Sequence, residues 1–290
     1  MKTDLAKSYE LCRSLNAKHG KTYYLATLLL PPKKRPYVHA LYGFARYADE
    51  IVDDLDSTLS LQAKKQHLQE FGDRIISDIK MGHSSDPVGA AFVDTITTWK
   101  IPLEHVEAFL NSMAMDLEIS SYETFSDLER YVYGSAAVIG LQMVPILEPI
   151  DESAYEFAKD LGVAFQLANF IRDVNEDLDR GRIYLPLSEL RSHGVTPEVL
   201  RERKATPEIK KALAEQIARV RTLQKNADSG IKLLHPSSRP CIQAASTLYC
   251  GIVDEVEKID FEIFDQRAST SMARRLSIFI PALMKSYFSR

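Results

Sequence analysis

Residues 160–186 (DLGVAFQLANFIRDVNEDLDRGRIYLP) combine acidic and amide side chains at a spacing that could hold a metal ion. At 100° per residue on a helix, one stripe about 80° wide contains Gln166, Asn169, Asp173 and Asp177. Apolar side chains cover much of the remaining helix surface, and burying polar groups among them is unfavourable unless a cation compensates. Mg²⁺ prefers such oxygen ligands. A solvated helix face is the alternative interpretation, because paired aspartates are common on protein surfaces.

Residues 40–54 (ALYGFARYADEIVDD) carry a second stripe of the same kind. Tyr42, Arg46, Asp49 and Asp53 fall within about 60° of one another on a helix. Each stripe therefore contains an Asp-x-x-x-Asp pair inside an apolar surround. Two independent solvated faces would explain the stripes separately. Two facing rows of carboxylates that hold a metal cluster would explain both at once.

The chemistry that requires two such rows is the metal-assisted departure of a diphosphate. This leaving group carries about three negative charges, which bound cations and arginines offset. Arg46, Arg172 and Arg182 lie beside the two motifs, although Arg172 also fits a surface or helix-packing role. An allylic diphosphate leaves a carbocation behind, and aromatic faces stabilise such a cation where water is excluded. Tyr184 could reach the site from a loop or could serve only as a loop anchor. The aromatic candidates on helices are Tyr23, Tyr24, Phe44, Tyr131, Tyr133, Phe165, Phe170 and Tyr249. We expect only a minority of them to line the site.

The whole chain has the composition of a folded globular protein. Its 290 residues are 45% hydrophobic and 26% charged, and its net charge of −4 gives no basic field for binding nucleic acid. Three cysteines without a CxxC motif and seven scattered histidines indicate neither a disulfide framework nor a zinc site. The sequence contains no apolar run of about 18 residues and no signal peptide, so a cytoplasmic protein is expected.

Hydrophobic residues recur mainly at helical spacing, which predicts an all-α fold. The helices are expected near residues 2–18, 21–29, 34–54, 58–79, 87–98, 102–117, 126–146, 152–179, 206–233, 237–262 and 268–287. Ser126 and Glu129 have the spacing of a capping box. No linker is long enough to separate domains, so residues 1–290 are expected to form a single domain. The apolar segment 276–284 would suit contact with a membrane, but a buried terminal helix is the interpretation that we favour.

With these motifs the sequence resembles the squalene and phytoene synthases, the family of head-to-head (1′–1) prenyl transferases. The matching segments are residues 19–31, 40–54, 160–186 and 248–264, in the family's order and spacing. The combination of ARYADEIVD with RDVNEDLDRGRIYLP is highly specific. Residues 131–140 (YVYGSAAVIG) depart from the usual family pattern and look like the variant in some bacterial phytoene synthases. This departure leaves the pocket contacts of that helix open.

The resemblance implies a class I isoprenoid synthase fold with a central cavity, and it implies roles for individual residues. The ligands of Mg²⁺, or alternatively Mn²⁺, would be Asp49, Asp53, Asp173 and Asp177, with Asn169 and Gln166 supporting the metal cluster. The contacts to diphosphate would come from His19, Lys21, Arg46, Arg172, Arg182 and Tyr184. The cavity would be lined by Tyr23, Tyr42, Tyr131 and Tyr249.

The resemblance also implies a two-step reaction. Two prenyl diphosphates condense to a cyclopropylcarbinyl diphosphate, which then ionises and rearranges. Loss of a proton gives phytoene or dehydrosqualene, whereas hydride from NADPH gives squalene. Thr27, one turn after Tyr23, and the small residues 134–137 would leave room for a long tail. We therefore expect phytoene from two geranylgeranyl diphosphates, without a nicotinamide cofactor.

The sequence is compatible with several alternative products and functions. A C30 product from farnesyl diphosphate, either dehydrosqualene or squalene, would need a shorter cavity. Chain-elongating transferases and terpene cyclases usually carry a DDxxD motif, which this sequence does not contain. A non-catalytic assembly factor of the same family would be expected to lose the acidic pairs, and all four aspartates are present. Because the product is a hydrocarbon, peripheral contact with the inner face of a membrane is expected.

Overall fold

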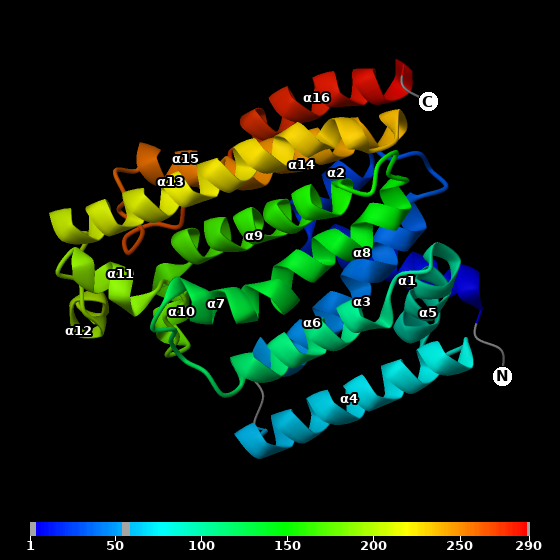
Figure 1. Cartoon of the computed structure of the whole chain (residues 1–290), viewed down its shortest axis with the longest axis horizontal. Helices are drawn as coiled ribbons and strands as arrows, with labels where there is room; N and C mark the ends of the chain where they lie inside the picture. Colours follow the sequence, from blue (N-terminus) through cyan, green and yellow to red (C-terminus); the bar gives the residue numbers. More distant parts are fainter. Residues whose placement is uncertain (1–3, 54–58, 289–290) are drawn as a thin grey trace.

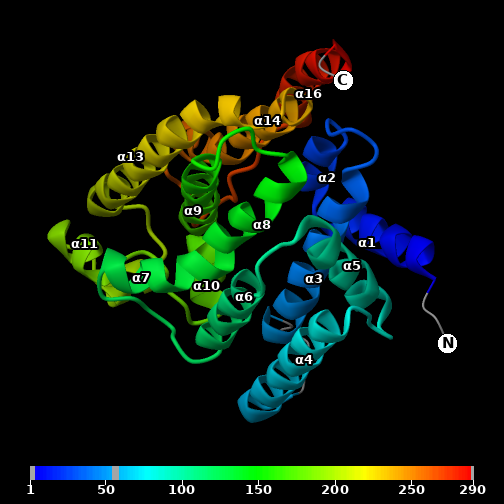
Figure 2. The same ribbon diagram turned by 45° about the vertical axis from the view of Figure 1, so that its right-hand side comes forward.

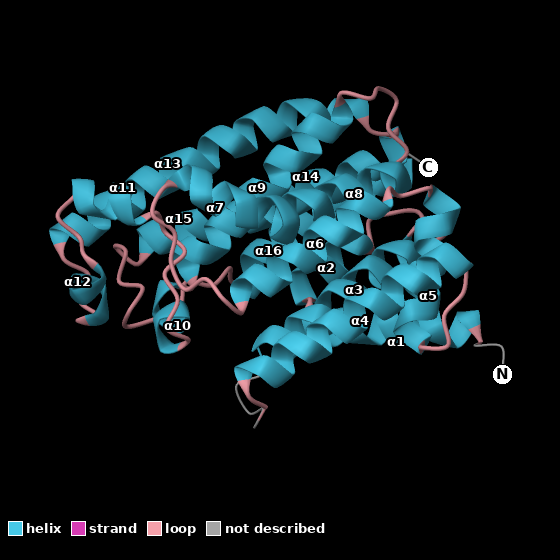
Figure 3. Ribbon diagram, turned by 60° about the horizontal axis from the view of Figure 1, so that its bottom comes forward, coloured by secondary structure: helices cyan, strands magenta, loops and turns pink. Residues whose placement is uncertain are grey.

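The computed structural model describes residues 4–53 and 59–288, and the side chains of Asp53 and Phe288 are outside that description. The described residues form helices joined by short loops, and Figure 3 draws no strand among them. Two isolated bridges join Ser121 to Ile183 and Pro149 to Leu234. The predicted all-α fold is therefore confirmed.

Helices follow one another closely along the described chain. The α-helices before the first irregular turn are α1 (Leu5–His19), α2 (Lys21–Thr27), α3 (Arg35–Asp53), α4 (Leu61–Met81), α5 (Pro87–Trp99), α6 (Leu103–Asp116) and α7 (Phe125–Val132). A π-helical turn, η1 (Tyr133–Ala137), joins α7 to α8. The middle helices are α8 (Val138–Leu147), α9 (Ala154–Arg172), α10 (Val174–Asp179), α11 (Leu187–Ser192), α12 (Pro197–Arg201) and α13 (Pro207–Gly230). The last elements are the 3₁₀ turns η2 (Ile231–Leu233) and η3 (Pro236–Ser238), followed by α14 (Arg239–Cys250), α15 (Ile252–Lys258) and α16 (Met272–Phe288).

Side-chain caps fix many of the helix starts. Asp86, Thr206 and Ser60 each accept a hydrogen bond from a backbone N–H in the first turn of the helix that follows, which satisfies a donor that the helix leaves unpaired. The capping box at the start of α7 is formed by Thr124 and Asp127. The predicted box of Ser126 and Glu129 was wrong because the helix begins earlier than that pattern required.

Helix α9 lies at the centre of the bundle (Figure 1 and Figure 2). It packs along α13 on one side and against α8 and η1 on another. Two glycines allow this close approach, since a Cβ at Gly140 would lie 2.3 Å from the carbonyl oxygen of Ala158, and a Cβ at Gly162 would lie 2.5 Å from that of Ala136. The position of α9 matters because it ends in the predicted acidic motif.

The buried side chains divide into two large clusters. One surrounds α9, α13 and α15, and the other is built mainly on α3, α5 and α6. An apolar cavity of about 370 Å³ lies between them, with walls drawn from both clusters. Its volume is in the range of ligand sites. We call it the tail cavity.

Several helix boundaries differ from the prediction. The helix expected at 152–179 ends at Arg172 and restarts at Val174, and the one expected at 237–262 is interrupted at Gly251. The helix expected at 126–146 contains the π-helical turn η1. The short helices α11 and α12 were missed, since each is too short to establish a hydrophobic period.

The terminal helix α16 lies at the edge of the molecule, beside α14 (Figure 1 and Figure 2). Its inner face packs on the second core cluster through Ile278, Phe279 and Ala282. The opposite face exposes the large apolar side chains Met272, Leu276, Ile280, Leu283, Met284 and Tyr287. The interpretation of a buried terminal helix was therefore only half right, because the described part of the chain leaves one face uncovered.

Candidate active site

A polar pocket of about 680 Å³ opens where three helices end. Asp49 lies near the end of α3, Asp116 is the last residue of α6, and Asp173 caps the C-terminus of α9. The C-terminal end of a helix carries partial negative charge, so a carboxylate there is unfavourable without a cation. Three acidic helix ends around one pocket therefore create a strong demand for positive charge. We call this pocket the mouth, because residues such as Arg46 line both it and the tail cavity.

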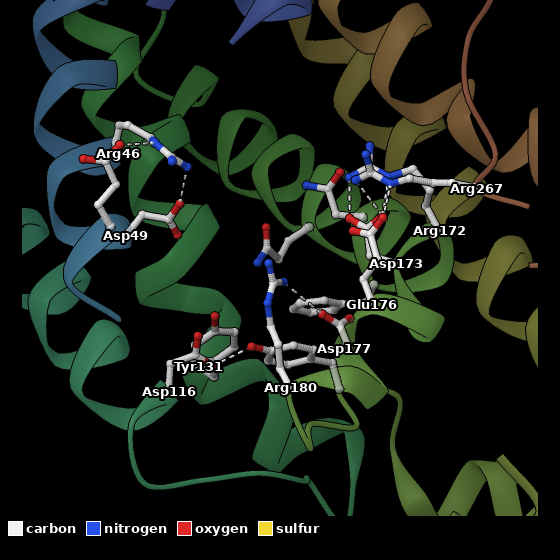
Figure 4. A pocket seen from close by; sticks show the side chains of 15 residues that line it. Arg46, Asp49, Asp116, Tyr131, Arg172, Asp173, Glu176, Asp177, Arg180 and Arg267 are labelled. Atoms are coloured by element: carbon white, nitrogen blue, oxygen red, sulfur yellow. Dashed lines mark hydrogen bonds and ion pairs between the residues drawn. The ribbon is translucent and has the colours of Figure 1, made fainter. Parts of the chain in front are cut away.

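One side of the mouth is formed by α3, and we call Arg46, Asp49 and Glu50 the first bank. Arg46 Nη1 lies 3.1 Å from Asp49 Oδ2, and Arg46 Nε lies 3.0 Å from Glu50 Oε1. These spacings of three and four residues place the side chains on one face of the helix, as the sequence predicted for Arg46 and Asp49. Figure 4 shows Arg46 and Asp49 facing the pocket. The side chain of Asp53, the last predicted member, lies outside the described part.

The opposite side is the second bank, formed by Asn169, Arg172, Asp173 and Asp177 at the junction of α9 and α10. The backbone leaves the helical region at Asp173 (φ −101°, ψ 12°), yet the Asp177 N–H still donates to the Asp173 carbonyl at 2.8 Å. The polar groups on both sides of the break line the mouth. Arg172 donates to both carboxylate oxygens of Asp173, at 2.7 and 2.5 Å.

A second arginine reaches the second bank from a distant part of the chain. Arg267 Nη2 lies 2.8 Å from Asp173 Oδ1, and its Nε lies 2.9 Å from Glu176 Oε1. Figure 4 shows Arg172 and Arg267 converging on Asp173 from two directions. Arg180 Nη1 stands 3.8 Å from Asp177 Oδ1. The guanidinium groups around Asp173 are well placed to exchange a carboxylate for the oxygens of a diphosphate.

Asp177 is a strongly perturbed carboxyl group of the mouth. Burial, and secondly the negative charge of Asp173, raise its pKa to about 8. A carboxyl group in this state gains much from a nearby divalent cation, which favours its ionised form. Such perturbed acids concentrate at functional sites.

The oxygen atoms of the second bank fit Mg²⁺. The buried Oδ1 of Asn169 has no hydrogen-bond partner among the described residues, and an amide oxygen is a suitable ligand for a hard cation. Together with Asp173 and Asp177 it supplies a set of oxygen donors on one wall. Within the described residues, no three acidic, histidine or cysteine side chains form a complete metal cage. Mg²⁺ commonly takes only one or two carboxylates and completes its shell with water and substrate phosphate.

The floor of the mouth contains Asp116, a buried carboxyl group that the sequence did not reveal. The Tyr184 hydroxyl donates to Asp116 Oδ1 at 2.7 Å, and Arg182 Nη1 lies 3.3 Å from Asp116 Oδ2. The Tyr184 ring stacks on Phe170 with centroids 4.2 Å apart and lies 5.5 Å from the ring of Tyr131. This arrangement anchors the loop after α10 beneath the second bank.

The tail cavity continues inward from the mouth and has aromatic rings near its entrance. The Tyr249 ring lies 4.3 Å from that of Tyr23 and 4.7 Å from that of Phe165. Tyr42 lines the cavity one turn before Arg46. Three of the small residues that were predicted to leave room for a long tail line the tail cavity, namely Thr27, Ser135 and Ala136.

Most of the predicted site residues meet at these two pockets. The mouth is lined by Arg46, Asp49, Tyr131, Gln166, Asn169, Arg172, Asp173, Asp177 and Tyr184. The tail cavity is lined by Tyr23 and Tyr42, with Tyr249 packed behind Tyr23. Arg182 is held by Asp116 at the floor. His19 and Lys21 are exposed at the junction of α1 and α2 and line neither pocket.

Three of the aromatic candidates lie elsewhere. Phe44 is a core residue stacked on Phe92, Tyr24 stacks on His39, and Tyr133 is exposed. The mouth in turn contains residues that the sequence motifs did not assign to it, namely Glu50, Asp116, Glu176, Arg180 and Arg267. Three of these stand within or beside the acidic motifs and could have been found by their spacing. Asp116 and Arg267 reach the mouth only through tertiary structure.

Comparison with known proteins agrees with this geometry. The family described as squalene/phytoene synthase matches residues 16–274. The phytoene synthase of Arthrospira platensis is 36% identical over 274 residues, covering 90% of this chain and 87% of the relative. The chloroplastic phytoene synthase of Daucus carota is 34% identical over 291 residues, covering 98% of this chain and 72% of the relative.

Solved structures give the same fold. A dehydrosqualene synthase in complex with ligand superposes with a TM-score of 0.88 at 26% identity, covering 98% of both chains. The squalene synthase HpnC from Alicyclobacillus acidocaldarius superposes with a TM-score of 0.80 at 23% identity, covering 89% of this chain and 96% of that one. The fold and the mouth define an isoprenoid synthase. More narrowly, the chain belongs to the squalene/phytoene synthase family and is a prenyltransferase.

Proposed function

We propose that this chain, acting as one catalytic unit, condenses two geranylgeranyl diphosphates head to head and converts the product to phytoene. The observation that carries the proposal is a mouth with two acidic banks and several arginines, opening onto an apolar cavity. The mouth suits a charged leaving group, and the cavity suits hydrocarbon tails. The similarity to the phytoene synthases of Arthrospira platensis and Daucus carota supports this product.

Asp49, Asn169, Asp173 and Asp177 are the residues that would hold Mg²⁺, and Asp53 is proposed as a further ligand. Bound Mg²⁺ would supply positive charge to the oxygens of the departing diphosphate. Arg46 and Arg172 turn from their carboxylates toward the same oxygens, and Arg267 assists them from its loop. Of the other proposed diphosphate contacts, Tyr184 and Arg182 lie at the floor. His19 and Lys21 stand outside the pockets and would need to move.

The walls of the tail cavity then determine what happens to the carbocation. When the C–O bond of the first substrate breaks, its electron pair leaves with the diphosphate. The cation that remains is captured by the double bond of the second substrate, and a proton leaves carbon as the cyclopropane ring closes. Tyr23, Tyr42 and Tyr131 present rings beside this region and exclude water. After the second ionisation a proton is lost from carbon, so the route to phytoene needs no hydride donor.

The main competing product is the C30 hydrocarbon dehydrosqualene. The similarity to a dehydrosqualene synthase structure favours it, whereas the relatives with higher sequence identity favour phytoene. Thr27 and Ala136 are small residues in the cavity wall and would accommodate a C20 tail. Each additional buried methylene contributes about 0.8 kcal/mol, so the better-filled cavity prefers the longer substrate.

The direct test is a competition. The purified chain receives equal concentrations of farnesyl and geranylgeranyl diphosphate with Mg²⁺, and the hydrocarbons are identified by mass spectrometry. We expect a C40 product in excess. Exclusive formation of a C30 product would refute the assignment of substrate length, and the absence of any hydrocarbon would refute the activity.

We also propose that the exposed face of α16 rests on a membrane surface. None of the described helices is long and apolar enough to cross a membrane. The exposed apolar stripe of α16 runs along a helix without an acidic residue, and Arg275 and Lys285 add positive charge to that helix. An anionic lipid surface fits both features. Sedimentation with anionic vesicles tests this, and Leu276→Ser with Ile280→Ser should reduce the bound fraction.

A further inference from the structure

Two polar side chains in the wall of the tail cavity have buried oxygen atoms without a hydrogen-bond partner in the described part of the chain. They are Asn16, through its Oδ1, and Ser135, through its Oγ. Asn16 is the more unusual, because the whole residue is 0% exposed. A hydrocarbon tail cannot satisfy an amide oxygen, and a buried polar group without a partner is unfavourable. The position of Asn16 therefore calls for an explanation in terms of what enters the cavity.

The orientation of the Asn16 amide is fixed from behind. Its Nδ2 lies 2.9 Å from Nδ1 of His39, which is 3% exposed. Burial, with the charges of Arg13 and Arg35, lowers the pKa of His39 to about 4, so its ring is neutral near neutral pH. A neutral ring can accept at Nδ1, and the amide then donates through Nδ2 and directs Oδ1 away from His39. The ring of Tyr24 stacks on His39 at a centroid distance of 5.6 Å and holds its plane.

The Asn16 oxygen lies at the end of the cavity that adjoins the first bank. A Cβ at Gly20 would be 2.5 Å from Asn16 Oδ1 and 2.6 Å from the ring of Tyr42. Both groups thus pack closely against Gly20, and a side chain at residue 20 would displace them. Tyr42 precedes Arg46 by one helical turn, and both line the tail cavity. Asn16 is therefore close to the region where the proposed reaction creates positive charge.

We propose that Asn16 is a catalytic residue that stabilises the carbocation with its amide oxygen, and that His39 is its positioning residue. This inference rests on the proposed function. An oriented dipole aimed at developing charge is most effective where water is excluded. Asn16 forms no covalent bond and takes no proton. The electron pair of the broken C–O bond leaves with the diphosphate, and the amide oxygen faces the cation that remains.

The test compares Asn16→Leu, which keeps the approximate size of the side chain, with the wild-type chain. We expect kcat for hydrocarbon formation to fall about 30- to 100-fold while KM changes less than about twofold, because the lost interaction exists only with the cation. The cyclopropylcarbinyl diphosphate and alcohols from capture by water should accumulate. Thr95→Val is the matched control, since Thr95 is a fully buried polar residue outside both pockets.

The role of His39 is tested by a pair of variants. His39→Leu should lower kcat about 10-fold and raise the share of alcohols. His39→Gln should restore most of the wild-type product ratio, since its side-chain oxygen can accept from Asn16. Equal product ratios in the two variants would refute the positioning role. If Asn16→Leu does not fold, as judged from its Tm, this pair decides the proposal.

Two outcomes would overturn the inference. One is a folded Asn16→Leu variant with wild-type kcat and product ratio, and the other is a variant in which only KM rises. The comparison uses whichever prenyl diphosphate the wild-type chain converts. A wild-type chain that accepts only farnesyl diphosphate would contradict the assigned product but would leave the test of Asn16 intact.

Discussion

The two banks of the mouth carry similar side chains but differ in their exposure to solvent. The side chain of Asp49 in the first bank is 47% exposed, whereas those of Asp173 and Asp177 in the second bank are 16% and 10% exposed. An exposed carboxylate keeps most of its water, whereas a buried one depends on its protein partners and on bound cations. From this difference we infer that the second bank binds metal more tightly, whereas the side chains of the first bank rearrange when substrate binds.

The largest effect should come from removing one carboxylate of each bank. Asp173→Asn should lower kcat/KM about 1,000-fold, and Asp49→Asn about 100-fold, because the more buried site supplies more of the field that acts on the diphosphate. Steady-state assays of hydrocarbon formation measure both values. An equal loss in the two variants would break the proposed asymmetry. Folded variants that keep wild-type activity would refute the catalytic role altogether.

Folding stability sets the pH range in which the banks can be compared. The pKa of His39 falls from 6.5 to about 4 in the folded chain, so the unfolded state binds more protons between these values. The contribution of His39 to the free energy of unfolding is therefore fully present above pH 6.5. It is lost as pH falls toward 4, and the loss amounts to about 3 kcal/mol in total. Urea unfolding at several pH values measures this loss. His39→Gln should flatten the dependence, and an unchanged slope in that variant would contradict the assignment.

Above pH 6.5, the banks should differ in how pH affects metal binding. The pKa of Asp177 is about 8, and its proton must leave before the carboxylate can bind Mg²⁺. Affinity for Mg²⁺ should therefore fall about 10-fold for each pH unit below 8. Titration calorimetry with buffers of different ionisation enthalpy reports the proton released. Asp177→Asn should abolish this dependence, whereas Asp49→Asn should preserve it.

A smaller difference is expected for the arginines. Arg267 pairs with Asp173 of the second bank, and Arg46 pairs with Asp49 of the first. Arg267→Gln should raise KM about 10-fold, since it removes a bidentate donor and leaves Asp173 less well neutralised. Arg46→Gln should raise KM by a smaller factor, because its bank is more solvated. The reverse order would show that the first bank provides the main diphosphate contacts.

The sequence predicted the two banks because their spacing is local. Residues at i, i+3 and i+4 share a helix face whatever the tertiary structure, so periodicity alone identifies Arg46, Asp49 and Asn169. The same periodicity could not predict the break at Asp173, since the turn there still keeps the polar groups on one side. It also missed α11 and α12, whose few residues do not establish a period.

What the sequence could not provide was long-range proximity. Asp116 lies at the end of an apolar helix, and Arg267 lies in the segment between α15 and α16, and neither position has a local signal for the mouth. Asn16 is a similar case, because its unpartnered oxygen is evident only when α1, α3 and the cavity are seen together. In each case the role of the residue follows from side chains that are distant in the sequence and adjacent in the folded structure.

The most direct test of the two-bank site is a crystal structure of the chain with Mn²⁺ and a non-reactive prenyl thiodiphosphate. Anomalous scattering would locate each metal ion. We predict peaks about 2 Å from carboxylate oxygens of both banks, Asp49 on one side and Asp173 or Asp177 on the other, with diphosphate oxygens between them. A diphosphate held by arginines alone, without a metal peak at either bank, would contradict this account.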